Sequence, residues 1–146
     1  MATFSRTTTV TTTIHAPAEI VWALLTNAAD FPRWNSTVTS VDGVIAPGKT
    51  IKLKTTLDPK RTFTLKVVEA TAPAHMTWKS GQAPFFQGVR TYDIVKRSKD
   101  VCVFTMTEKL SGLMYPLAAG SIPDFRESFE RYASDLKKEA EAIGNQ

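Results

Sequence analysis

The chain has 146 residues, of which 42% are hydrophobic and 22% are charged, and its formal net charge is +4. This balance excludes a disordered chain and indicates one globular domain over residues 1–146 with a sizeable core. Cys102 is the only cysteine, which excludes an internal disulfide and a cysteine metal cluster. The small basic excess does not by itself indicate an anionic partner.

The first residues, "MATFSRTTTV", lack the basic start and the continuous apolar run of a signal peptide. No stretch of the chain reaches the ~20 apolar residues that a membrane-spanning helix needs. We therefore expect a cytoplasmic protein without stable membrane insertion.

The N-terminal part of the chain predicts a strand followed by short helices. "TTTVTTTIH" places Val10 and Ile14 among threonines, a β-favouring composition with a period of two. "APAEIVWALLTN" has a proline suited to a first helical turn and apolar residues at i, i+4 spacing, so it predicts a short helix. In "AADFPRWNSTV", Pro32 restricts Phe31 and leaves Phe31 and Trp34 as apolar anchors in a loop or a second short helix.

The middle of the chain returns to strands. "KTIKLKTTL" and "RTFTLKVVE" each place apolar residues on one side, and "DPK" between them is a turn signal. The predicted pairs are Leu53 with Leu65, Ile51 with Val67 and Lys52 with Lys66. "HMTWKS" adds a strand with Met76 and Trp78 on a common face. About six strands are predicted after the first helices, which favours an antiparallel meander.

The stretch "GVRTYDIVKRSKDVCVFTMTEKLSG" predicts a β-hairpin. A three-residue turn, Ser98 to Asp100, would close Arg97 on Val101. Opposite positions in an antiparallel pair share one face, and this register keeps the apolar residues together. The predicted inward pairs are Ile94 with Phe104, Tyr92 with Met106, and Arg90 with Glu108.

The final segment, residues 121–146, predicts a long amphipathic helix of roughly 30 Å. Ser121 and Asp124 form a plausible capping pair, Pro123 suits the first turn, and Gly144 supplies the stop. Its apolar face is predicted to contain Ile122, Phe125, Phe129, Tyr132, Leu136, Ala140 and Ile143.

Three segments, "IHAPAEIVWALLTNAADFPRWN", the hairpin and "FRESFERYASDLKKEAEA", resemble the START-like, SRPBCC or helix-grip superfamily in its polyketide cyclase/dehydrase-like branch. The resemblance covers nearly the whole chain. It implies an α+β helix-grip fold, in which a curved antiparallel sheet wraps around the C-terminal helix and two short helices follow the first strand. It also implies a hydrophobic cavity between sheet and helix. By position, the cavity walls would come from Leu53, Phe63, Leu65, Trp78, Tyr92, Ile94, Phe104, Met106, Phe125, Phe129 and Tyr132.

Known catalytic motifs are missing from the sequence. There is no H-E-x-x-H, no Cys/His cluster, no G-x-S-x-G and no glycine-rich phosphate loop, so we predict no metal and no cofactor. His15 and His75 are interpreted as strand-end or surface histidines, and Cys102 as a small buried hydrophobe. The catalytic residues are therefore unknown.

Arg90 and Glu108 are the strongest polar candidates. They form either a structural ion pair at the sheet rim or a pair inside a pocket that orients a polar head group, with Tyr92 as a nearby hydroxyl donor. "GLMYPLAAGS", residues 112–121, is interpreted as a flexible lid or as a connecting loop that packs on the core. The lysine-rich stretch 49–66 lacks the aromatic pattern of a nucleic-acid surface and is interpreted as the protection of exposed strands.

These observations predict a protein that binds a small hydrophobic or amphipathic molecule, lipid- or polyketide-like, as a monomer or a homodimer. The first alternative is a cyclase or dehydratase that uses Arg90, Glu108 and Tyr92 in the cavity. The second alternative is a co-chaperone-like interaction module, which would use its outer surface and leave the cavity small.

Overall fold

Seven strands form one antiparallel sheet in the computed structural model, which describes residues 5–82, 85–118, 120 and 122–146. The strand order is β1-β7-β6-β5-β4-β3-β2, so all neighbours after β1 are also consecutive along the chain. The strands are β1 Ser5–Ile14, β2 Val38–Asp42, β3 Thr50–Thr55, β4 Thr62–Thr71, β5 His75–Gln82, β6 Phe86–Ser98 and β7 Val101–Ser111. The predicted meander is confirmed, and β2 is the strand that the sequence pattern did not locate.

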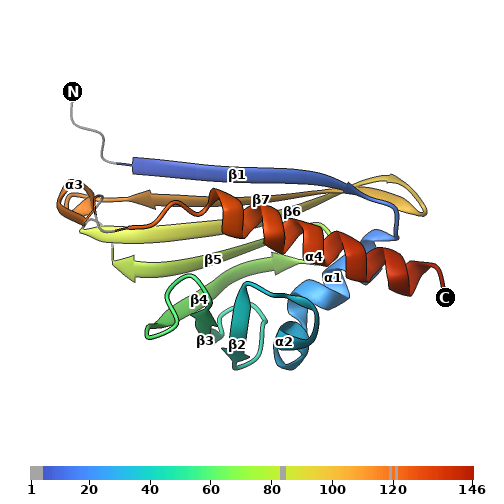
Figure 1. Ribbon diagram of the computed structural model, residues 1–146, viewed down its shortest axis with the longest axis horizontal. Helices are drawn as coiled ribbons and strands as arrows, with labels where there is room; N and C mark the ends of the chain where they lie inside the picture. The colour runs from blue at the N-terminus through green and yellow to red at the C-terminus, as the bar shows by residue number, and fades with distance from the viewer. Residues whose placement is uncertain (1–4, 83–84, 119, 121) are drawn as a thin grey trace.

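Five helical elements accompany the sheet in the described part of the chain (Figure 1). They are α1 Ala18–Thr26, the 3-10 helix η1 Ala28–Asp30, α2 Phe31–Trp34, α3 Tyr115–Ala118 and α4 Arg126–Gly144. None of the helices in the described ranges is long and apolar enough to cross a membrane.

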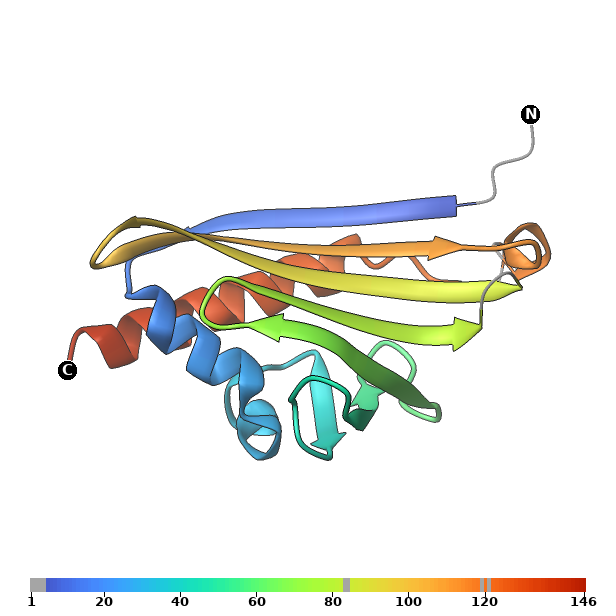
Figure 2. The same cartoon turned by 180° about the vertical axis from the view of Figure 1, so that it is seen from behind.

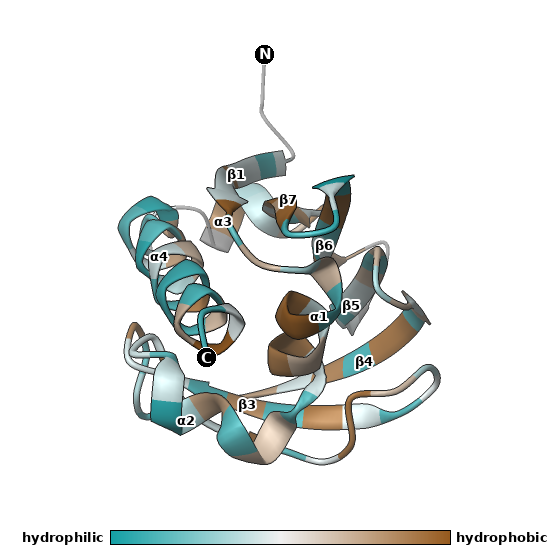
Figure 3. Ribbon diagram, turned by 90° about the vertical axis from the view of Figure 1, so that its right-hand side faces the viewer, coloured by the Kyte–Doolittle hydropathy of each residue, from teal (hydrophilic) through white to brown (hydrophobic). Residues whose placement is uncertain are grey.

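The sheet is strongly curled, and α4 closes its open side. Seen end on, the strands turn from β1 through β5 to β3, while α4 lies opposite the middle of the curl (Figure 3). The long strands β1, β7, β6 and β5 run side by side along the molecule (Figure 2). This architecture confirms the predicted α+β helix-grip fold.

Polar contacts fasten α4 at both edges of the curl. On the β1 side, Lys137 Nζ donates a hydrogen bond to the Thr13 carbonyl oxygen at 2.6 Å. On the α2 side, Ser36 Oγ donates to Asp135 Oδ2 at 2.7 Å, and Arg33 Nη1 pairs with Glu139 Oε1 at 2.6 Å. Helix α4 is therefore held over the concave face of the sheet by contacts with β1 on one side and with the segment around α2 on the other.

The β6–β7 hairpin has the predicted register over most of its length. Arg90 is opposite Glu108, and the pairs Tyr92 with Met106 and Ile94 with Phe104 are also present. The turn itself differs, because Ser98 pairs with Val101 and an irregularity between Lys96 and Ser98 places Arg97 in a bulge. The predicted three-residue loop is wrong, and the extra residue is absorbed by the strand.

The predicted β3–β4 register is wrong by two residues. The observed pairs are Leu53 with Phe63, Ile51 with Leu65, and Lys52 with Thr64. The turn lies earlier than predicted, because β3 ends at Thr55 and Leu57 leaves the strand. An even shift keeps every side chain on its predicted face, so the apolar face of this pair is still continuous.

Helix α4 begins at Arg126, later than predicted. Asp124 Oδ1 accepts a hydrogen bond from the Arg126 backbone N–H at 3.0 Å, so it contributes to the start of the helix. Pro123 and Ile122 precede the helix, and Ser121 lies outside the described residues. At ~1.5 Å per residue, the 19-residue helix is about 28 Å long.

Candidate ligand-binding cavity

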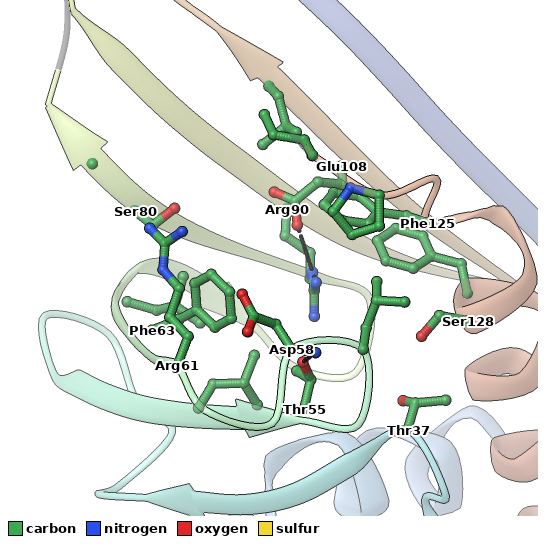
Figure 4. Close-up of a pocket in the computed structure, with 18 of the residues that line it drawn as sticks. Thr37, Thr55, Asp58, Arg61, Phe63, Ser80, Arg90, Glu108, Phe125 and Ser128 are labelled. Atoms are coloured by element: carbon green, nitrogen blue, oxygen red, sulfur yellow. Dashed lines mark hydrogen bonds and ion pairs between the residues drawn. The ribbon is translucent and has the colours of Figure 1, made fainter. Parts of the chain in front are cut away.

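A cavity of about 600 Å³ lies between the concave face of the sheet and the first turns of α4 (Figure 4). Residues from six strands, β2 to β7, from the β3–β4 turn and from the segment before α4 surround it. The helix contributes Ser128, Phe129 and Tyr132. The polar contacts at the sheet edges hold α4 over the concave face, and the cavity lies beside the contacts that Phe129 and Tyr132 make with β6.

The lining residues divide into buried ones, at the floor of the cavity, and exposed ones, at its mouth. Leu53 and Leu65 on the strands are buried and form the floor, and Phe129 on α4 is buried on the opposite side. Leu117, Met114 and Leu57 line the same cavity but are exposed, Leu117 by 80%. The mouth therefore lies at the end of the sheet where the β3–β4 turn and the α3 segment meet.

Eight of the thirteen predicted site residues line this cavity. They are Leu53, Phe63, Leu65, Arg90, Glu108, Phe125, Phe129 and Tyr132. The other five, Trp78, Tyr92, Ile94, Phe104 and Met106, are not on the cavity wall but in the close-packed core, each at most 4% exposed. Helix α1 lies inside that half of the curl (Figure 3). The strands therefore face packed side chains there and the cavity further along.

Arg90 and Glu108 lie side by side on the cavity wall. The Arg90 Nε and Nη2 atoms are both 3.0 Å from Glu108 Oε1. Their side chains are only 13% and 11% exposed, so the pair lies well inside the rim. The Arg90 guanidinium also lies over the Phe129 ring, 5.1 Å from its centroid. The ion pair on the sheet is thus in contact with α4 through the Phe129 ring.

Two tyrosine hydroxyls continue this polar cluster into the core. Arg90 Nη1 donates to the Tyr92 hydroxyl at 3.4 Å, and the Tyr92 and Tyr132 hydroxyls are 3.2 Å apart. Burial raises the pKa of both phenols, and the neighbouring Tyr92 raises that of Tyr132 further. Both tyrosines therefore remain neutral hydrogen-bond donors at physiological pH.

Sequence reasoning missed the residues at the cavity mouth. Asp58 and Arg61 in the β3–β4 turn, with Thr55 and Ser80 at strand ends, line the cavity together with the predicted residues (Figure 4). Turn residues carry no periodic signal, so only the position of the turn could have indicated them. The predicted lid segment does contribute two wall residues, Met114 and Leu117, whereas Tyr115 is buried and lies beside Phe86.

A second polar cluster lies outside the cavity, on the outer face of the sheet. His75 Nδ1 is 2.5 Å from Asp93 Oδ1, and His75 Nε2 is 2.6 Å from Glu69 Oε1. The hydrogen bond to Asp93 raises the pKa of His75, and the Glu69 carboxylate adds to this effect.

Cys102 is fully buried, as predicted, and burial raises the pKa of its thiol. No group of acidic, histidine or cysteine residues in the described chain could hold a metal ion.

The family model for "polyketide cyclase / dehydrase and lipid transport" proteins matches residues 5–141. Comparison with curated proteins gave no match. Solved structures with the same fold include a START superfamily protein from Mycobacterium smegmatis, with 16% identity and a TM-score of 0.71 over 94% of this chain and 98% of that chain.

Two plant proteins are similar in the same way. The major latex-like protein 151 of Panax ginseng has 12% identity and a TM-score of 0.71 over 99% of this chain and 100% of that chain. A point mutant of norcoclaurine synthase from Thalictrum flavum, in complex with a transition-state analogue, has 11% identity and a TM-score of 0.73 over 98% of each chain. At such identities the likeness concerns the fold.

Proposed function

Because the chain belongs to the polyketide cyclase/dehydrase and lipid transport family, we propose that it binds one small hydrophobic or amphipathic molecule in the cavity under α4. The main support is the cavity itself. Its volume of about 600 Å³ falls in the range of known small-molecule sites, and such sites combine apolar walls with a few polar groups. Arg90 and Glu108 are the charged residues of the wall that lie mostly buried, as one ion pair.

The experiment that tests this proposal detects a bound molecule and then fills the cavity with a larger side chain to prevent binding. Native mass spectrometry of gently purified protein should detect a co-purifying molecule, and Nile red, an uncharged fluorescent dye, should bind to emptied protein. Leu65→Trp should abolish dye binding, because the larger ring projects into the floor of the cavity. Val95→Trp is the matched control, because Val95 is exposed and is not a lining residue. Equal dye binding by both variants would contradict a site in the cavity.

A second candidate is an enzyme of the cyclase or dehydratase class. The observation that favours it is that the Glu108 carboxylate, the Arg90 guanidinium and the Tyr132 phenol all line the cavity and are linked through Tyr92. Such groups are able to move a proton and to stabilise an oxyanion. The norcoclaurine synthase bound to a transition-state analogue is an enzyme with the same fold. Conversion of a bound polyketide-like ketone, lost in Glu108→Gln while binding is retained, would establish this activity.

The cellular location and the oligomeric state belong to the same proposal. We propose a cytoplasmic protein that works as a monomer or a homodimer, which fractionation of cells and sedimentation analysis can test.

A further inference from the structure

We propose that the ligand of this cavity carries an uncharged hydroxyl group, as an alcohol or a phenol does, which binds between Arg90 and Glu108, and that the cavity discriminates against free carboxylates. This inference rests on the proposed function and specifies its ligand class.

The positive charge of Arg90 is already compensated. Two of its nitrogen atoms face the same carboxylate oxygen, Glu108 Oε1, at 3.0 Å each. A ligand carboxylate that approached Arg90 would therefore place a second anion beside Glu108, whose side chain is largely buried, and like charges repel more strongly there than in bulk water. A single unpaired arginine would favour an anion, but this pair does not.

The rest of the wall adds no net attraction for an anion. Four charged residues line the cavity in the part of the chain that the structure describes. Arg61 and Arg90 are positive, whereas Asp58 and Glu108 are negative. The charges cancel in number, so the cavity as a whole offers no excess of either sign.

The pair leaves both a donor and an acceptor for a ligand. Arg90 has five N–H groups, of which one faces the Tyr92 hydroxyl and two face Glu108 Oε1. Among the described residues, Glu108 Oε2 accepts no hydrogen bond from another side chain or from the backbone. Arg90 and Glu108 both lie on the cavity wall, so their remaining N–H groups and Oε2 are available to a ligand. A hydroxyl group can accept from the guanidinium and donate to the carboxylate at once. A methyl group can do neither, and a carboxylate can only accept.

Three probes of one shape test the inference: 2-naphthol, 2-naphthoic acid and 2-methylnaphthalene. At pH 7 the first and third are uncharged and the second is an anion. Their affinities are measured as displacement of Nile red. A hydrogen bond to a charged group should make 2-naphthol bind at least about tenfold more tightly than 2-methylnaphthalene. The carboxylate should bind no more tightly than 2-methylnaphthalene.

Two variants reverse or remove the preference. Glu108→Gln keeps the shape of the side chain but frees the charge of Arg90, so 2-naphthoate should gain about tenfold in affinity. Arg90→Leu combined with Glu108→Leu should lower the 2-naphthol affinity to that of 2-methylnaphthalene. Glu19→Gln, in the exposed ion pair with Lys96, is the control and should leave all three affinities unchanged.

The outcomes separate this inference from the function on which it rests. If Nile red and the three probes fail to bind the wild type, the proposed function is wrong and the inference falls with it. If all three bind equally, or if 2-naphthoate binds best, the cavity is a binding site but the inference is overturned. The wild-type comparison stands even where a variant fails to fold.

Discussion

Replacing Arg90 with leucine should destabilise the protein strongly, because it leaves the Glu108 carboxylate nearly buried without its cation. Breaking a buried pair from one side costs about 3–5 kcal/mol in unfolding free energy. Here Glu108 retains 11% exposure and faces the cavity, from which water can reach it, so we expect the lower end of this range, ~3 kcal/mol. Loss of the contact between Arg90 and the Phe129 ring is included in this value.

The double variant, Arg90→Leu with Glu108→Leu, should recover most of that loss. Two leucines leave no charge without a partner in the wall, and replacing a buried ion pair by apolar residues is often neutral. The expected coupling between the two positions is therefore at least about 2 kcal/mol.

Urea unfolding of the wild type, both single variants and the double variant measures this coupling. The exposed Glu19–Lys96 pair gives a matched cycle in which no coupling is expected. Single-variant losses below about 1 kcal/mol without coupling would show that the pair is solvated like a surface pair, and would refute the reasoning.

Three further predictions concern packing, pH and the backbone. Phe129→Ala should lower the unfolding free energy by about 2 kcal/mol, because Phe129 already borders the cavity. Phe104→Ala in the packed core should lower it by about 3–5 kcal/mol. Equal losses in urea unfolding would contradict the presence of the cavity beside Phe129. The raised pKa of His75 should give a stabilisation of less than about 1 kcal/mol that is complete below pH ~6.5 and is lost as the pH rises through the raised value. The melting temperatures of the wild type and His75→Gln should therefore converge above the raised pKa of His75. A difference that stays constant with pH would show that protonation of His75 does not stabilise the fold. Gly112→Ala should cost about 1–3 kcal/mol, because Gly112 has φ of +126° and a Cβ there would lie 2.3 Å from the Phe85 carbonyl oxygen. Gly48→Ala, with positive φ but no neighbour within 4 Å, should cost less in the same melting experiment.

Much of the fold could be predicted because its elements have local signals. The β6–β7 register followed from matching apolar residues, and Arg90 was correctly placed opposite Glu108. The β3–β4 register could not be fixed in this way, because sliding by two residues leaves the same faces apolar. Strand β2, Val38–Asp42, has too short a pattern to be located before its partner strand is known.

The limits of the cavity could not be predicted from the pattern of apolar residues. Tyr92 and Phe104 are apolar-face residues of their strands just as Leu53 and Leu65 are, yet the first two are packed and the second two border the cavity. The difference arises from what lies opposite them in space. Periodicity identifies the inner face of a strand, but it does not tell whether another side chain fills the space in front of that face.

The division of β6 and β7 into a packed half and a cavity-facing half affects how such a sequence can diverge. In the packed half every change of volume is felt by close neighbours, so few substitutions are tolerated. In the other half, around Arg90, Glu108 and Leu110, a substitution changes the shape and polarity of an empty space before it disturbs any packing. A lineage can therefore acquire a new ligand through a few wall positions while the curled sheet persists, and solved structures share this fold at identities of only 11–16%.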